Sequence, residues 1–301
     1  MTNTFFTRTL YDCVRWGVWL MIANQLLQLT GAIFEKKLLG LYPFFQMTFI
    51  RSSVRVVIFF IFILKQGNIK ETLAMKQPLC HLIRLTTYVT YNFAILYGLS
   101  LVTLTTSCAL QYTTPLFTIL LSSWILKEKI GKHKWIAVTL SSIAVLIAMQ
   151  PHLKDFQVVS LIILFATLVG SLNKVLIRRL VSTEHTLSIT LFGNAAMVLI
   201  FFPAVFMDWH PVSWNDFGYF TIAGVLTAAA QFTAVQALRF AKASTLAPLD
   251  YTSIVWAALF DFFVWGAVPT FYLILGTSII IASNLYLLRA SKTDASFKEA
   301  L

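Results

Sequence analysis

Charged residues are scarce in this chain, and acidic ones are the scarcest. Asp, Glu, Lys and Arg make up 12% of its 301 residues, whereas 58% are hydrophobic. A soluble domain typically carries about 25% charged residues, so this composition excludes an ordinary soluble protein and indicates a polytopic membrane protein. Cysteine is also rare. We expect Cys13, Cys80 and Cys108 to be free thiols rather than parts of a disulfide framework.

Several motifs that would indicate chemistry are absent from the sequence. It contains no HExxH, no G-x-S-x-G, no paired acidic metal motif and no ATP-binding loop. We therefore expect no metal site, no cofactor and no enzymatic activity. A membrane-embedded enzyme stays open as a hypothesis of another class, and so does a channel or scaffold. The net charge of +11 comes without a compact basic domain, so nucleic acid is not an expected partner.

The hydrophobic residues fall into ten runs that could cross a membrane as helices. Crossing a hydrocarbon core takes roughly twenty helical residues. The predicted spans are 16–34, 44–64, 80–98, 103–126, 135–149, 156–177, 186–207, 217–239, 244–265 and 271–288. The first run lacks a small-x-small cleavage site, so we expect a retained helix rather than a signal peptide.

The positions of the cations predict how the chain is oriented. Arg51 and Arg55 lie inside the second span, and every other Lys and Arg except Lys36, Lys37 and Lys154 falls on or near one side. Cations close to span ends are retained in the cytoplasm during insertion. We therefore expect a multi-pass protein with both termini cytoplasmic, whose basic inner rim contacts anionic membrane lipid.

One short motif occurs twice and indicates an internal duplication. It reads Gln-Tyr-Thr-Thr at 111–114 and Asp-Tyr-Thr-Ser at 250–253, each time beside a long apolar run. We predict two five-span units, 1–150 and 151–301. An odd number of spans per unit inverts the second unit relative to the first. The cationic loop at 127–132 matches the uncharged loop at 265–270, as an inverted repeat requires.

Three ionisable residues inside predicted spans are candidates for a substrate site. Arg51 and Arg55 lie one helical turn apart on one face, and Asp250 lies at a depth similar to that of Arg55. An ionisable group in the bilayer costs about 3 kcal/mol, so it usually faces a cavity or a partner. The alternative is a structural role in helix pairing. Asp261 lies near the end of its span, where a structural role is the favoured interpretation.

Uncharged polar and aromatic residues occupy corresponding places in the two units. They either bond neighbouring helices together or line a cavity. We include seven of them in the predicted site: Asn24, Tyr91, Asn92, Gln111, Tyr112, Gln231 and Tyr251. Tyr112 and Tyr251 are predicted aromatic walls, because a tyrosine ring can stack on a heterocycle or face a cation. Pro115 and Pro248 lie inside the fourth and ninth spans, where each removes a backbone donor and is able to kink its helix.

The residues around the repeated motif carry a family resemblance. The segment 109–117, the loop 127–130 and the segment 243–257 resemble EamA-type members of the drug/metabolite transporter superfamily. This resemblance implies ten transmembrane helices in two inverted five-helix units. It also implies secondary transport by alternating access, without a cofactor. One departure is Ala267, which stands where members commonly have a glutamate, whereas Glu128 keeps the corresponding acid in the first unit.

A narrower resemblance is to bacterial S-adenosylmethionine uptake transporters. It is carried by the segments 78–84 and 151–156 and by Asn173-Lys174. It implies a bacterial inner-membrane protein that takes up or exchanges a small polar or zwitterionic metabolite, with a coupling ion or counter-substrate as a further partner. An arginine would bind the substrate's carboxylate, Asp250 its cation, and a tyrosine its adenine. Export of amino acids or amphipathic metabolites is the alternative.

Overall fold

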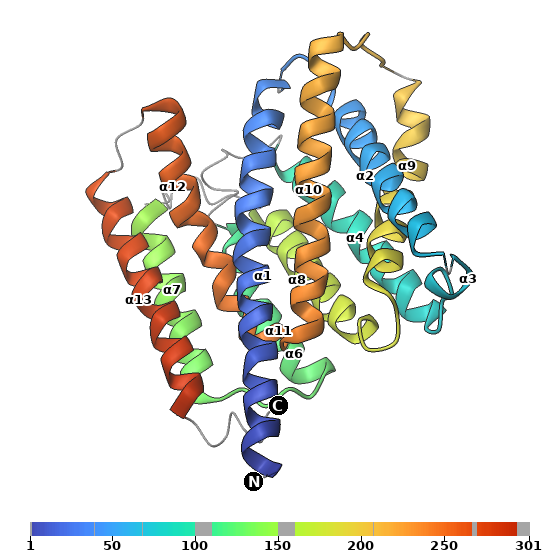
Figure 1. Cartoon of the computed structure of the whole chain (residues 1–301). Coiled ribbons are helices and arrows are strands. Elements are labelled where there is room, and N and C mark those ends of the chain that lie inside the picture. The colour runs from blue at the N-terminus through green and yellow to red at the C-terminus, as the bar shows by residue number, and fades with distance from the viewer. Residues whose placement is uncertain are drawn as a thin grey trace.

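The structure is a computed structural model, which describes residues 2–38, 40–67, 69–99, 110–149, 160–206, 208–266 and 270–293. Every regular element in these ranges is a helix, which confirms the all-α prediction (Figure 1). The elements are α1 Thr2–Leu38, α2 Phe44–Gln66, α3 Ile69–Thr72, α4 Pro78–Leu99, α6 Thr114–Ile125, α7 Lys132–Met149, α8 Ser160–Leu180, α9 Thr186–Val205, α10 Trp214–Phe240, α11 Ala243–Leu246, the 3-10 helix η2 Ala247–Tyr251, α12 Thr252–Trp265 and α13 Phe271–Thr293.

Helices lie at all ten predicted spans, and five of them are long and apolar enough to cross a membrane. The membrane-length segments are Val14–Glu35, Phe44–Gln66, Leu161–Leu180, Thr186–Pro203 and Trp214–Phe240. α6 and α13 add shorter apolar segments, Thr114–Ile125 and Phe271–Leu287. The chain is therefore a multi-pass helical membrane protein, and the count of ten spans stays a prediction.

The long helices pack in pairs that join the two predicted units. α1 lies along α10, α4 packs on α8, α2 on α9, and α7 on α13 (Figure 1). In the predicted duplication α1 corresponds to α8 and α4 corresponds to α10, so exchanging the units turns the α1–α10 pair into the α8–α4 pair. The α2–α9 and α7–α13 pairs each join two corresponding helices, so the exchange leaves them unchanged. Such pairing is expected of two related units, although the boundary at residue 150 stays a prediction. α1 begins and α13 ends at the same end of the bundle.

Small residues allow α1 and α10 to approach closely. A Cβ added at Gly17 would lie 2.9 Å from the Ala241 Cβ, and one added at Gly31 would lie 2.7 Å from the Thr227 Cγ2. Close backbone approach of this kind is typical of membrane helices, where packing replaces the hydrophobic driving force. These contacts hold α1 against the second unit along its length.

Both prolines lie in the first turn of a helical segment. Pro115 lies in the first turn of α6, after a turn at Tyr112 and Thr113. Pro248 lies in the first turn of η2, which separates α11 from α12. A proline is tolerated in a first turn because its missing N–H would have had no helical partner there. The ninth predicted span therefore runs without a gap through α11, η2 and α12, and the 3-10 segment at Pro248 interrupts its α-helical geometry.

Candidate functional site

A cavity of about 340 Å³ lies where the segments around Pro115 and Asp250 face α1, α4 and α8. Ligand pockets usually measure about 300 to 1,000 Å³, so a small metabolite would fit. The wall comes from both predicted units. It consists of Gln25, Tyr88, Tyr91, Gln111, Tyr112, Thr114, Pro115, Gly170, Asn173, Lys174, Asp250 and Ser253.

An ion pair is the strongest electrostatic feature of this wall. The Lys174 Nζ lies 2.5 Å from the Asp250 Oδ2, and Gln25 Nε2 donates to the Asp250 Oδ1 at 3.1 Å. The Lys174 side chain is 34% exposed and that of Asp250 is 12% exposed, so both charges border the open space. Opposite charges held together within a membrane bundle typically mark a substrate or ion pathway.

The rest of the wall offers flat rings and an unused polar atom. The Tyr112 ring stacks on Tyr251 with centroids 6.3 Å apart and planes inclined by 27°. The Tyr91 ring lies on Gly170, where an added Cβ would come within 2.8 Å of the ring. The buried Asn173 Oδ1 has no hydrogen-bond partner within the described residues, so it can accept a bond from a ligand.

Four predicted site residues line the cavity: Tyr91, Gln111, Tyr112 and Asp250. Gln111 and Tyr112 come just before α6, and Asp250 lies on η2. The repeated motif therefore places its polar members beside a turn in the first unit and in a 3-10 segment in the second. Interrupted helices commonly form the substrate sites of transporters, because the free backbone groups and side chains can turn towards a cavity.

The two arginines lie on α2, outside this wall. Arg51 Nη1 contacts both carboxylate oxygens of Glu35, at 2.9 and 2.8 Å. Arg55 is buried, and its Nε donates to the Thr227 Oγ1 at 3.0 Å. Asp250 takes Lys174 and Gln25 as partners rather than Arg55. Substrate contact by the two arginines stays a prediction.

Two predicted asparagines bond within their own helices. The Asn24 Nδ2 lies 4.0 Å from the Met21 Sδ on α1. The Asn92 Nδ2 donates to the Tyr88 carbonyl on α4 at 2.7 Å. Neither asparagine is part of the cavity wall.

Gln231 and Tyr251 connect helices. The Asn194 Nδ2 donates to the Gln231 Oε1 at 2.6 Å, which joins α9 to α10. Tyr251 is fully buried behind Tyr112, and its hydroxyl lies 2.7 Å from the Ser142 Oγ on α7. This arrangement is typical of helix packing, with Tyr251 supporting the ring that lines the cavity. Asp261 lies on α12, but its side chain is outside the described residues.

Sequence reasoning did not include Gln25, Asn173 or Lys174 in the site. The orientation rule assigned Lys174 to the basic cytoplasmic rim, although it lies inside the sixth predicted span. The Asn173-Lys174 pair was a feature of the narrower resemblance and was the available signal. Gln25 adjoins the predicted Asn24, and the choice between neighbours depends on the rotation of α1, which sequence alone does not define.

A bundle of membrane helices around a small cavity that holds an ion pair is typical of membrane transporters. The EamA-like transporter family model matches residues 15–150 and 157–289. The chain belongs to this family and is therefore a transporter rather than an enzyme.

Known relatives agree with this assignment. An S-adenosylmethionine uptake transporter of Rickettsia prowazekii is 23% identical over 254 residues, covering 84% of this chain and 86% of the relative. A riboflavin transporter of Vibrio cholerae is 27% identical over 226 residues, covering 74% and 76%. A solved crystal structure matches the fold with a TM-score of 0.80 at 16% identity, covering 92% of this chain and 98% of the other. The resemblance to S-adenosylmethionine uptake transporters is thus confirmed.

Proposed function

We propose that this chain is a secondary transporter that takes up or exchanges S-adenosylmethionine across the bacterial inner membrane by alternating access. The observation that carries the proposal is the Lys174–Asp250 ion pair on the cavity wall. Energy would come from a coupling ion or a counter-substrate. The name of the Rickettsia relative supports the choice of substrate.

A zwitterion suits this pair because it carries both charges itself. Its carboxylate would take the Lys174 ammonium, and its sulfonium or ammonium would take the Asp250 carboxylate. Two new ion pairs would then replace the internal one, and the second cationic group of the substrate would lie against a tyrosine ring of the wall. An uncompensated charge in a poorly solvated site is costly, so a substrate with charge of one sign would bind less favourably.

The remaining wall suits the nucleoside part of the same substrate. The adenine ring would stack on Tyr112 or Tyr91, which adds favourable contact over a flat surface. The exocyclic amine of adenine would donate to the Asn173 Oδ1, which has no partner among the described residues. Arg51 and Arg55 are proposed as further contacts in a conformation where Glu35 and Thr227 release them.

Uptake of labelled S-adenosylmethionine into bacterial cells that lack their own uptake route tests the proposal. Cells expressing the chain should accumulate the label above vector controls. Unlabelled S-adenosylmethionine and S-adenosylhomocysteine should compete, whereas single amino acids should not. Absence of uptake at normal membrane abundance would rule out the proposed substrate. Release from loaded inside-out and right-side-out vesicles would separate uptake from export.

Riboflavin is a second candidate, favoured by the Vibrio cholerae relative and by the tyrosines of the wall. Riboflavin is uncharged at neutral pH, so it would not need the ion pair. Its transport should survive replacement of both charges in the Lys174→Gln/Asp250→Asn double variant. Transport of S-adenosylmethionine should not survive that replacement.

A further inference from the structure

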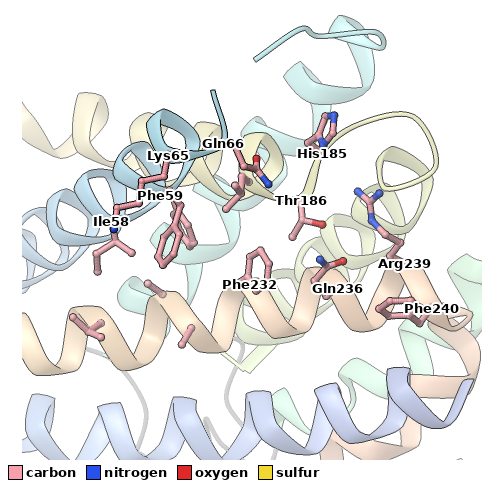
Figure 2. A pocket seen from close by; sticks show the side chains of 15 residues that line it. Ile58, Phe59, Lys65, Gln66, His185, Thr186, Phe232, Gln236, Arg239 and Phe240 are labelled. Carbon is pink, nitrogen blue, oxygen red and sulfur yellow. The ribbon is translucent and has the colours of Figure 1, made fainter. Parts of the chain in front are cut away.

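A second, larger groove lies between α2, α9 and α10, apart from the cavity described above (Figure 2). Its volume is about 650 Å³, and it shares no lining residue with the first cavity. Most of its wall is apolar, and several apolar side chains are exposed along it, including Phe62 at 55% and Val225 at 48%. The groove therefore opens sideways towards the surface that would face lipid.

One end of this groove is polar. Thr186 begins α9 there and His185 precedes it, and Gln236 and Arg239 come from the last turns of α10 (Figure 2). Arg239 Nη2 donates to the Glu184 carbonyl at 2.5 Å, which leaves the rest of its guanidinium fork for another acceptor. No Asp or Glu is among the residues that line the groove.

Two buried polar atoms at this end lack a partner within the described part of the chain. They are the Thr186 Oγ1, in a residue only 5% exposed, and the Gln236 Oε1. Leaving a buried polar group unsatisfied costs about 1–3 kcal/mol, so each atom favours a bound group that satisfies it. The Thr186 hydroxyl can donate to an anion, whereas the Gln236 oxygen accepts and would suit a head-group hydroxyl. α9 also directs its first backbone N–H groups and the positive end of its dipole towards this end, and both favour an anion.

We propose that the groove binds a membrane phospholipid with an anionic head group. Its phosphate would lie against the start of α9, with Arg239 and the Thr186 hydroxyl as donors. One acyl chain would lie between α2 and α10 against Phe59, Phe232 and Ala229. A free phosphate would use only the polar end, whereas the long apolar part of the groove fits a hydrocarbon chain. The polar end lies where α2 and α10 end and α9 begins, the depth at which lipid head groups lie.

Native mass spectrometry of the detergent-purified full chain tests this site. The probes are phosphatidylglycerol, phosphatidylcholine with the same acyl chains, and soluble glycerol phosphate. One phosphatidylglycerol per chain should be retained about tenfold better than phosphatidylcholine, and glycerol phosphate should not bind. Equal retention of the two lipids, or binding of glycerol phosphate alone, would overturn the proposal.

Three variants separate this site from general lipid adhesion. Thr186→Val has nearly the same shape and removes a hydroxyl that has no partner among the described residues, so the fold should persist while the preference for phosphatidylglycerol falls. Arg239→Gln should lower the preference for phosphatidylglycerol further. Ala229→Phe fills the apolar part and should reduce retention of both lipids. Lys132→Gln, an exposed cation outside the groove, is the matched control and should change nothing. Unchanged retention in Thr186→Val and Ala229→Phe would contradict the proposal.

Discussion

At the scale of single residues, the environment of each charge separates the cavity from the packing around it. The ion pair of Lys174 with Asp250 borders open space, whereas the buried Arg55 bonds to Thr227 and lies behind the cavity wall against Tyr88. All three residues are ionisable and lie inside predicted spans. Their positions in the sequence identified Arg55 and Asp250 as candidates but not Lys174, and only the surroundings of the three residues rank them.

The ion pair leads to the first prediction. Asp250→Asn removes the carboxylate and leaves the Lys174 ammonium without its partner, so uptake of a zwitterionic substrate should fall at least tenfold, or about 1.4 kcal/mol. Lys174→Gln should have a similar effect. Initial rates of labelled uptake, normalised to membrane abundance, measure it.

Asp216→Asn is the matched control for this prediction. Asp216 accepts hydrogen bonds from Tyr42 and Ser213 and is not part of the cavity wall. Its replacement should leave uptake unchanged. Equal losses in Asp216→Asn and Asp250→Asn would show that the effect is not specific to the cavity.

Two stacked tyrosines give the second prediction. Tyr251→Phe removes one hydroxyl bond to Ser142 behind the wall, so stability should drop by about 1 kcal/mol while the KM for uptake is unchanged. Tyr112→Leu removes a ring that faces the cavity and should raise KM severalfold. Melting temperature and uptake kinetics report the two effects. A raised KM in Tyr251→Phe would place its hydroxyl in contact with the substrate.

At the scale of elements, broken helices and close helix contacts build the site together. Pro115 and Pro248 lie in the first turns of α6 and η2, and the turn before α6 and the 3-10 geometry of η2 place Tyr112 and Asp250 on the cavity wall. A contact between the units holds this geometry: Glu128 accepts hydrogen bonds from the backbone N–H and the hydroxyl of Ser244 at the start of α11. Glu128 therefore fixes the helical segment that leads to Asp250, which is a structural role.

The contact between α1 and α10 gives the third prediction. In Gly31→Ala the new Cβ would lie 2.7 Å from the Thr227 Cγ2, so Thr227 must shift, and with it the acceptor of the Arg55 hydrogen bond. We expect a loss of about 1–3 kcal/mol, the usual cost of overpacking. Thermal unfolding of the purified protein measures the loss.

Gly218 provides the control on the same pair of helices. It lies within α10, and an added Cβ would meet nothing within 4 Å. Gly218→Ala should leave stability unchanged or raise it by about 0.5–1 kcal/mol, because alanine loses less backbone freedom in a helix. Similar destabilisation in both variants would contradict the close-contact interpretation.

At the scale of the whole molecule, the helix pairs tie the two predicted units into one bundle. α1 with α10, and α4 with α8, cross between the units, and the cavity lies among helices of both. A relative movement of the units would therefore change the cavity wall itself. Alternating access requires such a coupling between domain movement and the substrate site.

Orientation gives the fourth prediction. Positive-inside retention places the loop at Asp208 outside the cell and the loop at Lys129 inside. In a variant without Cys13, Cys80 and Cys108, a membrane-impermeant maleimide should label Asp208→Cys in intact cells. Lys129→Cys should react only after the cells are opened. The reverse pattern would invert the predicted topology.

Much of the fold could be predicted from sequence because membrane insertion depends on local properties. A long apolar run forms a helix in the bilayer wherever it occurs, so the all-helical class and the helix positions follow from composition. Part of the site also followed, since the repeated motif identified Tyr112 and Asp250. Pro248 was recognised as able to distort the ninth helix, but a proline does not reveal that the distortion is a 3-10 segment between two α-helical ones.

The sequence by itself determined that the chain is a helical membrane transporter of the EamA-like family, and it supplied the charged residues from which a site could be built. The tertiary structure alone decided that Lys174, and not Arg55, lies against Asp250. Lys174 and Asp250 are 76 positions apart, on α8 and η2. Their contact depends on how the helices rotate and cross, which is set by packing among many residues at once rather than by any local pattern.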